Sequence, residues 1–478
     1  MRLYFVGILI ILSIKLIGQD ITDFDPNKKF HPDSIKRWTN SIMTETSKKH
    51  PGFYRYTTKK RFGFLIDSTM QTVTDSLTAL DFYRKIKPLY GQIGCLHTGV
   101  SLSPEYDNYL GKTSTLIPIE VFINNEKQVF ITKYYSTDQS IPLKSEILSI
   151  NDRPIKEILK TLFKAIPSDG YNETEKILLL NHRFAFWYQT VIDINENFEI
   201  SIKSEEATET YKLKGVAKEI FPTMESLESS NDKQLEFEIR GNTGILMVHS
   251  FAKTVIKNNG QNFKKFIKTT FKTIKAKRIQ NLIVDLRYNT GGTDGNAVFL
   301  ASHFFDKPFR YWDKIEVTED LAKEIKGLVR VVYGKPIKKD TTYLWRKSKF
   351  TNEFNYYETQ KPAKYNFNGQ TYILTNGLCL SSCGDVTAIL SHNKKAKVLG
   401  QESGGGFQGN TSGIIPTSKI PTGLVITIPL QKYTNAVDLN KNFGHGTMPD
   451  YPMTPTLKNW VDKKDVEMEL ALKLIKGE

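Results

Sequence analysis

A serine at the predicted start of a helix is the residue in this chain best placed to act as a nucleophile. Residues 371–375 form an apolar stretch of strand length, Asn376 and Gly377 mark a turn, and helical apolar spacing begins at Val386. Ser382 therefore comes where the loop enters the helix, near unpaired backbone N–H groups and the positive end of the helix dipole. These surroundings can stabilise an oxyanion, although they also suit a serine that only caps the helix.

Two glycine-rich turns flank this serine in the sequence. Residues 281–287 have the pattern of a buried strand and lead to Gly291 and Gly292, and residues 397–400 lead to the glycines at 404–406. Glycine has no Cβ, so its backbone amide can approach a ligand closely. Three strand ends with glycine or serine turns predict one shared cleft.

In this order, these segments resemble the family of C-terminal processing peptidases and tricorn-type core serine proteases, also called tail-specific proteases. Residues 285–292 match the family's Asp-Leu-Arg-x-Asn-x-Gly-Gly element. Residues 382–385 match its Ser-x-x-acid nucleophile loop, with Asp385 for the usual Glu, and residues 444–450 match its Gly-x-Gly-x-x-Pro-Asp turn. Each motif is weak alone, but together they are specific from about Gly241 onward.

The resemblance implies acyl-transfer chemistry with Ser382 as the nucleophile. The oxyanion hole would consist of the backbone amides of Cys383 and of Gly291 or Gly292. Ser381 is the alternative nucleophile if the turn is shifted by one residue, but the spacing to Asp385 favours Ser382.

The general base is predicted to be a histidine. Processing peptidases use a lysine about two dozen residues after the serine, but this chain has Gly406 there and no lysine between Lys397 and Lys419. Tricorn-type relatives instead place a histidine in an N-terminal turn. His97, followed by a threonine and flanked by glycines, matches that turn, although the two residues before it do not. We therefore interpret the pair as Ser/His rather than Ser/Lys.

An acid that orients this histidine should come late in the chain. Asp438, ahead of the turn at Gly444, is the candidate. Asp450 is expected to have a structural part in that turn, and His445 is a rival base because it also lies between glycines.

The elements that must position these residues predict an α/β protein of several domains. The resemblance implies a β-α spiral core of the crotonase/ClpP type, an N-terminal helical region and a divergent PDZ-like, β-rich domain. The PDZ-like features are a hairpin at 117–135 and the segment 143–155, in which Lys144 and Asp152 replace the usual glycines. A C-terminal amphipathic helix is expected to pack on the core. The predicted divisions are a signal peptide at 1–19, the helical region at 20–110, the PDZ-like domain at 111–218 and the peptidase core at 235–478.

The N-terminus has the pattern of a secretory signal peptide. Arg2 precedes an apolar run at 3–12 that is too short to span a membrane, and small and polar residues follow. An uncleaved N-terminal anchor is the alternative. We expect an extracytoplasmic protein, periplasmic or secreted, with no integral span after signal removal.

The charge and the cysteine content bear on whether the protein binds nucleic acid, holds a metal or forms a disulfide. The formal net charge is +15, but lysines are spread along helices such as 263–274, which favours a solvated face over a nucleic-acid surface. The three cysteines lack metal-type spacing, so a zinc site is not expected, and we predict no cofactor. In an exported protein one pair could be oxidised, and a Cys379–Cys383 disulfide would brace the nucleophile loop.

Together these patterns predict an exported serine endopeptidase that hydrolyses peptides or unfolded proteins through an acyl-enzyme. The alternative is a catalytically inactive peptide- or ligand-binding protein on the same fold. The oligomeric state is not determined by the sequence.

Overall fold

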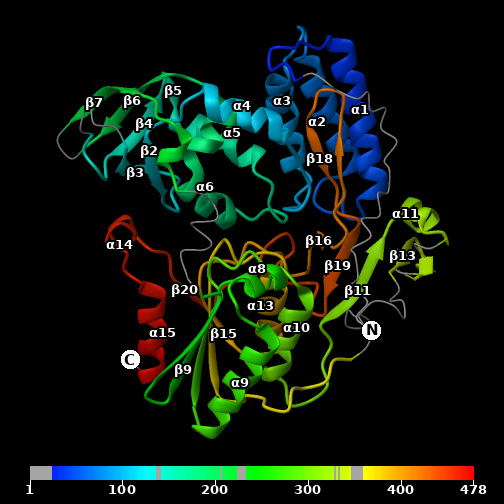
Figure 1. The fold of residues 1–478 in the computed structure, drawn as a ribbon, viewed down its shortest axis with the longest axis vertical. Helices are drawn as coiled ribbons and strands as arrows, with labels where there is room; N and C mark the ends of the chain where they lie inside the picture. The colour runs from blue at the N-terminus through cyan, green and yellow to red at the C-terminus, as the bar shows by residue number, and fades with distance from the viewer. Residues whose placement is uncertain are drawn as a thin grey trace.

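The computed structural model describes residues 24–135, 141–204, 207–222, 233–327, 330–331, 334–345 and 359–477. The predicted signal peptide lies outside these residues. Figure 1 shows an upper part, with N-terminal helices beside one sheet, and a lower part built on a second sheet. Both parts contain helices as well as strands, and this confirms the α/β class. No helix in the described ranges is long and apolar enough to cross a membrane.

The N-terminal region is mainly helical, as its periodicity predicts. Its helices begin at good capping residues, for example Thr78, whose side chain and that of Asp81 cap each other's backbone amides. Apolar residues such as Phe82 and Ile86 then face the core. The elements are α1 (Pro32–Lys49), α2 (Lys59–Gln71), α3 (Ala79–Gly91), β1 (Gly99–Ser101) and α4 (Pro104–Thr113).

The second unit is a sheet in the order β2-β3-β4-β6-β7, and β5 pairs with β4. The predicted hairpin is confirmed, because β2 and β3 pair antiparallel. Helix α6 lies against β2, and α5 against α3 of the N-terminal region. The elements are β2 (Ile119–Ile123), β3 (Val129–Tyr134), β4 (Glu146–Ile150), β5 (Arg153–Pro154), α5 (Ile155–Ala165), α6 (Thr174–Trp187), a π-helical turn (Tyr188–Ile192), β6 (Asn197–Lys203), β7 (Thr208–Lys214) and a 3-10 turn (Lys218–Ile220).

The lower part contains a six-stranded sheet in the order β20-β15-β14-β10-β9-β8. Its strands from β20 to β9 are parallel, and β8 pairs antiparallel at the edge. Residues 282–284 are buried on both faces of the sheet, which explains their unbroken apolar run. The strands are β8 (Leu235–Arg240), β9 (Thr243–Val248), β10 (Asn281–Asp285), β14 (Gln370–Thr375), β15 (Lys397–Gly400) and β20 (Tyr451–Pro452).

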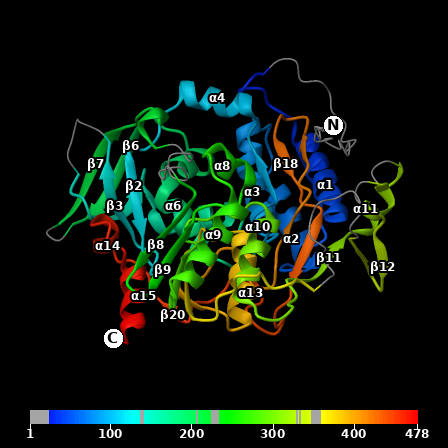
Figure 2. The ribbon, with the colours of Figure 1, turned by 60° about the horizontal axis from the view of Figure 1, so that its bottom comes forward.

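Helices cover both faces of this sheet. Figure 2 shows α9, α10 and α13 beside one another, and α10 contacts both of the others. On the other face α15 packs against β14 and β15 through the buried Ala471, which confirms the predicted C-terminal helix. The helices are α8 (Lys253–Asn258), α9 (Phe263–Ala276), α10 (Asp294–Ala301), a 3-10 turn (Ser302–Phe304), α13 (Ser382–His392), α14 (Leu457–Val461) and α15 (Val466–Lys476).

Two smaller sheets connect distant parts of the chain. One has the order β1-β18-β17, so the strand after His97 pairs with a strand near the C-terminal end. The other has the order β12-β13-β11-β19-β16. Their remaining elements are β11 (Trp312–Val317), α11 (Glu319–Glu324), β12 (Ile337–Lys339), β13 (Thr342–Leu344), β16 (Thr411–Ser412), β17 (Thr417–Lys419), β18 (Val425–Thr427) and β19 (Gln431–Asn435).

Candidate active site

Ser382 is the first residue of α13 and follows a strained turn. Ser381 has φ 50° and ψ −127°, a backbone conformation that costs a non-glycine residue about 1–3 kcal/mol. Ser382 is 1% exposed, and its Oγ has no hydrogen-bond partner among the described residues. The side chain of Ser381 makes no capping hydrogen bond either. The helix-cap role therefore explains neither serine.

The turn at Gly291 packs directly against the nucleophile loop. Gly291 has φ 97°, and a Cβ there would lie 2.8 Å from the Leu380 carbonyl oxygen and 3.1 Å from the Ser382 nitrogen. Gly292 has φ 135°, and its Cβ would lie 2.2 Å from the Ala252 nitrogen. Only glycine fits either position without displacing backbone, so the two glycines set the distance between the turn and Ser382.

The three predicted oxyanion donors differ in their hydrogen bonds. The Cys383 amide donates to the Leu380 carbonyl at 2.9 Å, and the Gly291 amide donates to Asn289 Oδ1 at 2.9 Å. Within the described residues the Gly292 amide has no acceptor. An oxyanion beside Ser382 would therefore find the Gly292 amide free, whereas the Cys383 and Gly291 amides would have to share or exchange their acceptors.

The third glycine-rich turn also reaches α13. A Cβ on Gly405 would lie 2.9 Å from the Gly384 Cα and 3.1 Å from the Ser381 nitrogen. The structure thus brings all three predicted turns together around Ser382, as expected for parallel strands whose carboxyl ends share one edge of a sheet.

Asp385 anchors the first turn of α13. It is 2% exposed, and the Asn410 side chain donates to Oδ1 at 3.3 Å. Burial, assisted by the nearby Asp294, raises the pKa of Asp385 well above its usual value, while a hydrogen bond from the Asn435 side chain opposes this. The acid of the Ser-x-x-acid motif therefore binds side chains of the C-terminal segments and fixes the orientation of the helix.

His97 lies in the turn before β1, with its Nδ1 buried and unpartnered among the described residues. Burial lowers the pKa of His97 to about 4, although a hydrogen bond with the Thr411 backbone opposes the shift. The imidazole is therefore neutral at physiological pH, as a general base must be. Neither Ser382 Oγ nor His97 Nδ1 has a hydrogen-bond partner, so no bond joins these two atoms in this structure.

The structure places the predicted acid, Asp438, at the other end of α13. Its backbone amide approaches His392 Nδ1 at 3.4 Å, and its carboxylate accepts a hydrogen bond from the Asn440 amide. His392 follows Ser382 by ten helical residues, or about 15 Å at 1.5 Å per residue. The Asp438 carboxylate thus caps its own turn. The predicted role of orienting His97 would require a contact between these two side chains, and the structure shows none among the described residues.

His445 is engaged in the turn that contains it. Its Nδ1 lies 3.2 Å from Glu402 Oε1, which also accepts the Gly446 amide at 2.7 Å. In the same turn Asp450 accepts the Val398 amide at 2.8 Å, so its predicted structural role is confirmed.

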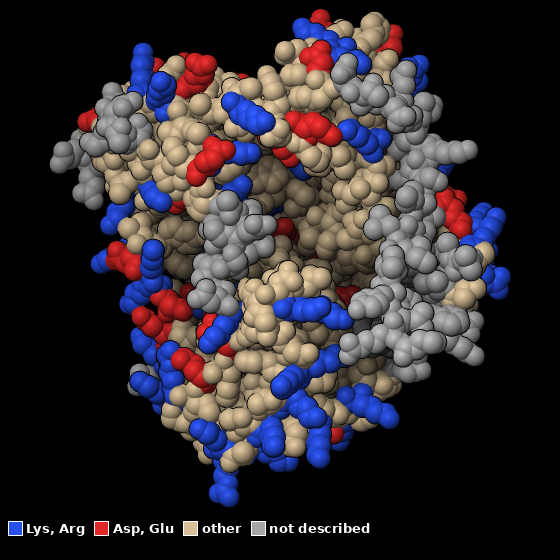
Figure 3. Space-filling view, in the orientation of Figure 1, with Lys and Arg blue, Asp and Glu red and all other residues tan. Residues whose placement is uncertain are grey.

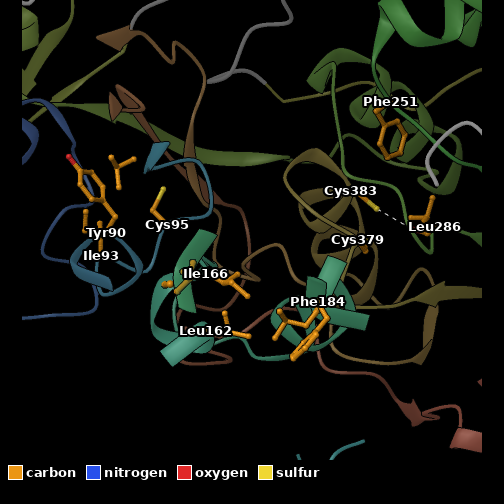
Figure 4. Close-up of a cluster of buried hydrophobic side chains, with 14 of the residues drawn as sticks. Tyr90, Ile93, Cys95, Leu162, Ile166, Phe184, Phe251, Leu286, Cys379 and Cys383 are labelled. Atoms are coloured by element: carbon orange, nitrogen blue, oxygen red, sulfur yellow. Dashed lines mark hydrogen bonds between the residues drawn. The ribbon is translucent and has the colours of Figure 1, made fainter. Parts of the chain in front are cut away.

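All three cysteines are buried free thiols, and the Cys379–Cys383 disulfide considered from the sequence is not formed. Figure 4 shows the Cys383 thiol directed at the Leu286 carbonyl, at 3.7 Å. Burial raises the pKa of Cys95 to about 12 and that of Cys383 well above its usual value. These thiols are therefore poor nucleophiles.

We predict that a thiol reagent such as dithionitrobenzoate reacts slowly with the native chain and titrates three thiols once urea unfolds it, because each sulfur is buried and unpaired. The absorbance of the released thiolate measures the reaction rate of the native chain and the number of thiols in the unfolded chain. Recovery of one thiol after unfolding without reductant would contradict this prediction.

Arg287 ties the strand before the Gly291 turn to the C-terminal helix. Its guanidinium lies 2.6 Å from Asp285, 2.6 Å from Asp465 and 3.3 Å from Glu467. The side chains of Asp285 and Glu467 are only 13% and 7% exposed, so they depend on this cation.

Replacing Arg287 by methionine is expected to lower the free energy of unfolding by about 3 kcal/mol, because it leaves buried carboxylates unpaired. The urea midpoint measures the loss. The matched control is Lys464→Met, which removes an exposed pair with Glu469 and should cost less than about 1 kcal/mol. Equal losses in the two variants would mean that the Arg287 cluster contributes no more than a surface pair.

Sequence reasoning did not single out two buried carboxyls near this site, Asp169 and Glu175. Burial raises the pKa of Asp169 to about 6 and that of Glu175 well above its usual value. Asp169 comes from the segment between α5 and α6 and Glu175 from the first turn of α6, and neither place contains a catalytic motif. Its only local signal is the turn pattern at Asp169-Gly170.

A buried serine at a helix start, held against a glycine turn with left-handed dihedrals, defines a hydrolase that uses an alcohol nucleophile, and the chain is a serine-type peptidase. Residues 242–453 match the model of peptidase family S41, so this part of the chain is similar to that family.

Solved structures show how far the fold is shared. Mature CPAF has a TM-score of 0.63 at 13% identity, covering 94% of this chain and 98% of that one. Mature CPAF complexed with lactacystin has a TM-score of 0.62 at 14% identity, covering 94% and 99%. The photosystem II D1 C-terminal processing protease has a TM-score of 0.42 at 12% identity, covering 89% and 94%. The likeness to CPAF concerns the fold and extends over nearly the whole chain.

Proposed function

We propose that the chain is an exported serine endopeptidase that cleaves peptides or unfolded proteins through an acyl-enzyme, with Ser382 as nucleophile and His97 as general base. The observation that carries this proposal is the Ser382 hydroxyl, which is buried and unpartnered beside the Gly291 turn. A buried hydroxyl without a partner loses its hydrogen bonds to water, so it is retained at a cost that function explains.

The proposed reaction follows the usual order of acyl transfer. His97 takes the Ser382 proton as the oxygen attacks the scissile carbonyl, and the negative oxygen that forms accepts the Gly292 and Cys383 amides. The imidazolium then gives its proton to the departing amine, and the acyl-enzyme remains. Water, deprotonated by the same imidazole, releases the acid product and restores the Ser382 hydroxyl.

The surroundings of the two lysines that flank position 406 in the sequence support a Ser/His rather than a Ser/Lys pair. Lys397 lies 3.4 Å from Asp450, and Lys419 lies 3.4 Å from Glu105. Both side chains are largely exposed. Neither lysine therefore has the buried, unpaired environment that lowers the pKa of a lysine base.

A cavity and a hollow support an extended peptide as the substrate. A cavity of about 350 Å³ lies between the second unit and the core, and its lining includes Phe122 of β2, Ile177 of α6 and Tyr288, three residues before Gly291. Figure 3 shows a hollow between the upper and lower parts that is bordered mainly by uncharged side chains. Within the proposal, the PDZ-like unit contributes one wall of the substrate site, and the core is the family's β-α spiral.

A fluorophosphonate probe tests the activity, because it phosphonylates only a serine that is activated as a nucleophile, with loss of fluoride. The full chain after signal removal is expected to be labelled at Ser382, as located by peptide mass spectrometry. It is also expected to cleave a reduced, unfolded protein faster than the same protein when folded. If this chain is folded and the probe does not label it, the proposal is overturned.

An inactive binding protein on the same fold is the second candidate. The missing hydrogen bond between His97 and Ser382 is the observation that favours it. A binder would leave the probe unreacted yet hold a peptide, which isothermal calorimetry detects.

Export is tested independently by the N-terminus of the mature protein. We expect the protein recovered outside the cytoplasm to begin near Asp20. Recovery of intact Met1 in the membrane fraction would favour an uncleaved anchor.

A further inference from the structure

A single buried side chain connects the His97 turn to the glycine-rich turn beside the nucleophile. Asp169, 2% exposed, lies between α5 and α6. Its Oδ1 accepts the Leu96 amide at 3.2 Å, and its Oδ2 accepts the Gly406 amide at 3.2 Å. The two oxygens thus hold two segments that are far apart in the sequence.

Both of these segments lead directly to the proposed chemistry. Leu96 immediately precedes His97. Gly406 follows Gly405, whose Cα lies against Gly384 in the first turn of α13. A shift of the Asp169 carboxylate would therefore change the position of the base relative to the nucleophile.

The backbone next to Asp169 is itself fixed in place. The Gly170 amide donates to the Gly94 carbonyl at 3.0 Å, at the start of the His97 turn. A Cβ on Gly170 would lie 2.4 Å from the Gly444 carbonyl oxygen. The loop is therefore packed between the His97 turn and the turn at Gly444. Thr174 Oγ1 donates to the Glu402 carbonyl at 2.9 Å, which attaches the same loop to the strand end at a second point.

An ion pair does not explain why the Asp169 carboxylate is buried. Within the described ranges it has no salt bridge, and the nearby Arg55 guanidinium donates to the Gly409 carbonyl at 3.0 Å. A buried carboxylate without a cationic partner is costly, so its retention points to a task other than stability. The titratable and charged groups that act on it, or on which it acts, are Arg55, Tyr56, Cys95, Glu175 and Asp385.

We propose that Asp169 is a positioning residue whose carboxylate holds the His97 turn and the Gly405 turn so that the imidazole can reach the Ser382 hydroxyl. The inference rests on the proposed function. When the carboxylate is ionised, both oxygens accept an amide. When it is protonated, one oxygen carries a hydrogen and accepts poorly, so one of the two turns is released.

The rate at which a fluorophosphonate phosphonylates Ser382 in the full chain tests this role. Asp169→Asn keeps the size of the side chain but presents an NH₂ group to one of the two amides. We expect its labelling at neutral pH to be about 100-fold slower, as expected when a reacting group is displaced by roughly 1 Å. Asp169→Glu, which restores a carboxylate, should recover part of the rate.

The matched control is Glu173→Gln, which removes an exposed ion pair between the same loop and Lys127 without touching the His97 turn. It should label at the wild-type rate. Unfolding midpoints of all variants report any general loss of stability, which by itself would leave the labelling rate of the folded protein unchanged.

The pH profile separates positioning from structure. The wild-type labelling rate is expected to fall below about pH 6, where Asp169 becomes protonated, because burial raises its pKa to that value. In Asp169→Asn this fall should move towards pH 4, where His97 itself becomes charged. If Asp169→Asn does not fold, Asp169→Glu decides: slower labelling of the folded variant supports the role, and labelling at the wild-type rate overturns it.

The outcomes distinguish the two proposals. If the wild-type chain is labelled and Asp169→Asn is labelled equally fast with the same profile, Asp169 has no positioning role while the proposed function stands. If the wild-type chain is not labelled, the proposed function fails, and the inference fails with it because there is no base to position.

Discussion

Replacing Ser382 by alanine is expected to abolish fluorophosphonate labelling and to lower kcat for peptide hydrolysis by about 10⁴–10⁶-fold, the range seen when the nucleophile of a serine peptidase is removed. Because Ser382 Oγ makes no hydrogen bond with the described residues, its loss should cost little stability. Labelling, kcat and the urea midpoint, measured on one preparation, separate the loss of activity from loss of fold.

Ser381→Gly is the matched control, since it removes the neighbouring hydroxyl. Glycine accepts the positive φ of this position more easily than serine does. The variant should therefore remain folded and be labelled at Ser382. Labelling that persists in Ser382→Ala and disappears in Ser381→Gly would assign the nucleophile to Ser381 instead.

Replacing His97 by glutamine is expected to lower kcat by about 10²–10⁴-fold, the usual contribution of a positioned general base, with a smaller change in KM. Glutamine fills similar space but cannot accept the serine proton. Steady-state kinetics on a fluorogenic peptide measure both parameters.

The control for His97 is His445→Gln, which alters the rival base. It removes the contact with Glu402, at 3.2 Å, and the ring contact with Tyr171, neither of which involves Ser382, so kcat should stay close to the wild-type value. A large loss in His445→Gln together with normal activity in His97→Gln would reverse the assignment of the base.

The parts of the site that the sequence predicts well are those encoded within a few residues. The approach of Gly291 and Gly405 to the Ser382 loop follows from strand-turn patterns, because parallel strands in one sheet bring their carboxyl ends to the same edge. Short sequence patterns likewise predicted the α/β class, the first hairpin and the C-terminal helix. The structure confirms all three.

Contacts between distant segments were not predictable in this way. Asp169 is separated from Leu96 by 73 residues and from Gly406 by 237, and no local motif records either contact. Asp438 has a suitable place in the sequence, but the course of the chain after β19 carries it along α13 to His392. Nor does a motif reveal that the Cys383 amide already donates to a carbonyl.

The pairing of β1 with β18 joins segments that are far apart in the chain. Gly99, two residues after His97, pairs with Thr427, so the strand that follows His97 is completed by a segment 328 residues further on. Under the proposed function, a chain in which these two strands have not paired has no assembled serine–histidine pair. Proteolysis then begins only once the two ends of this fold have come together.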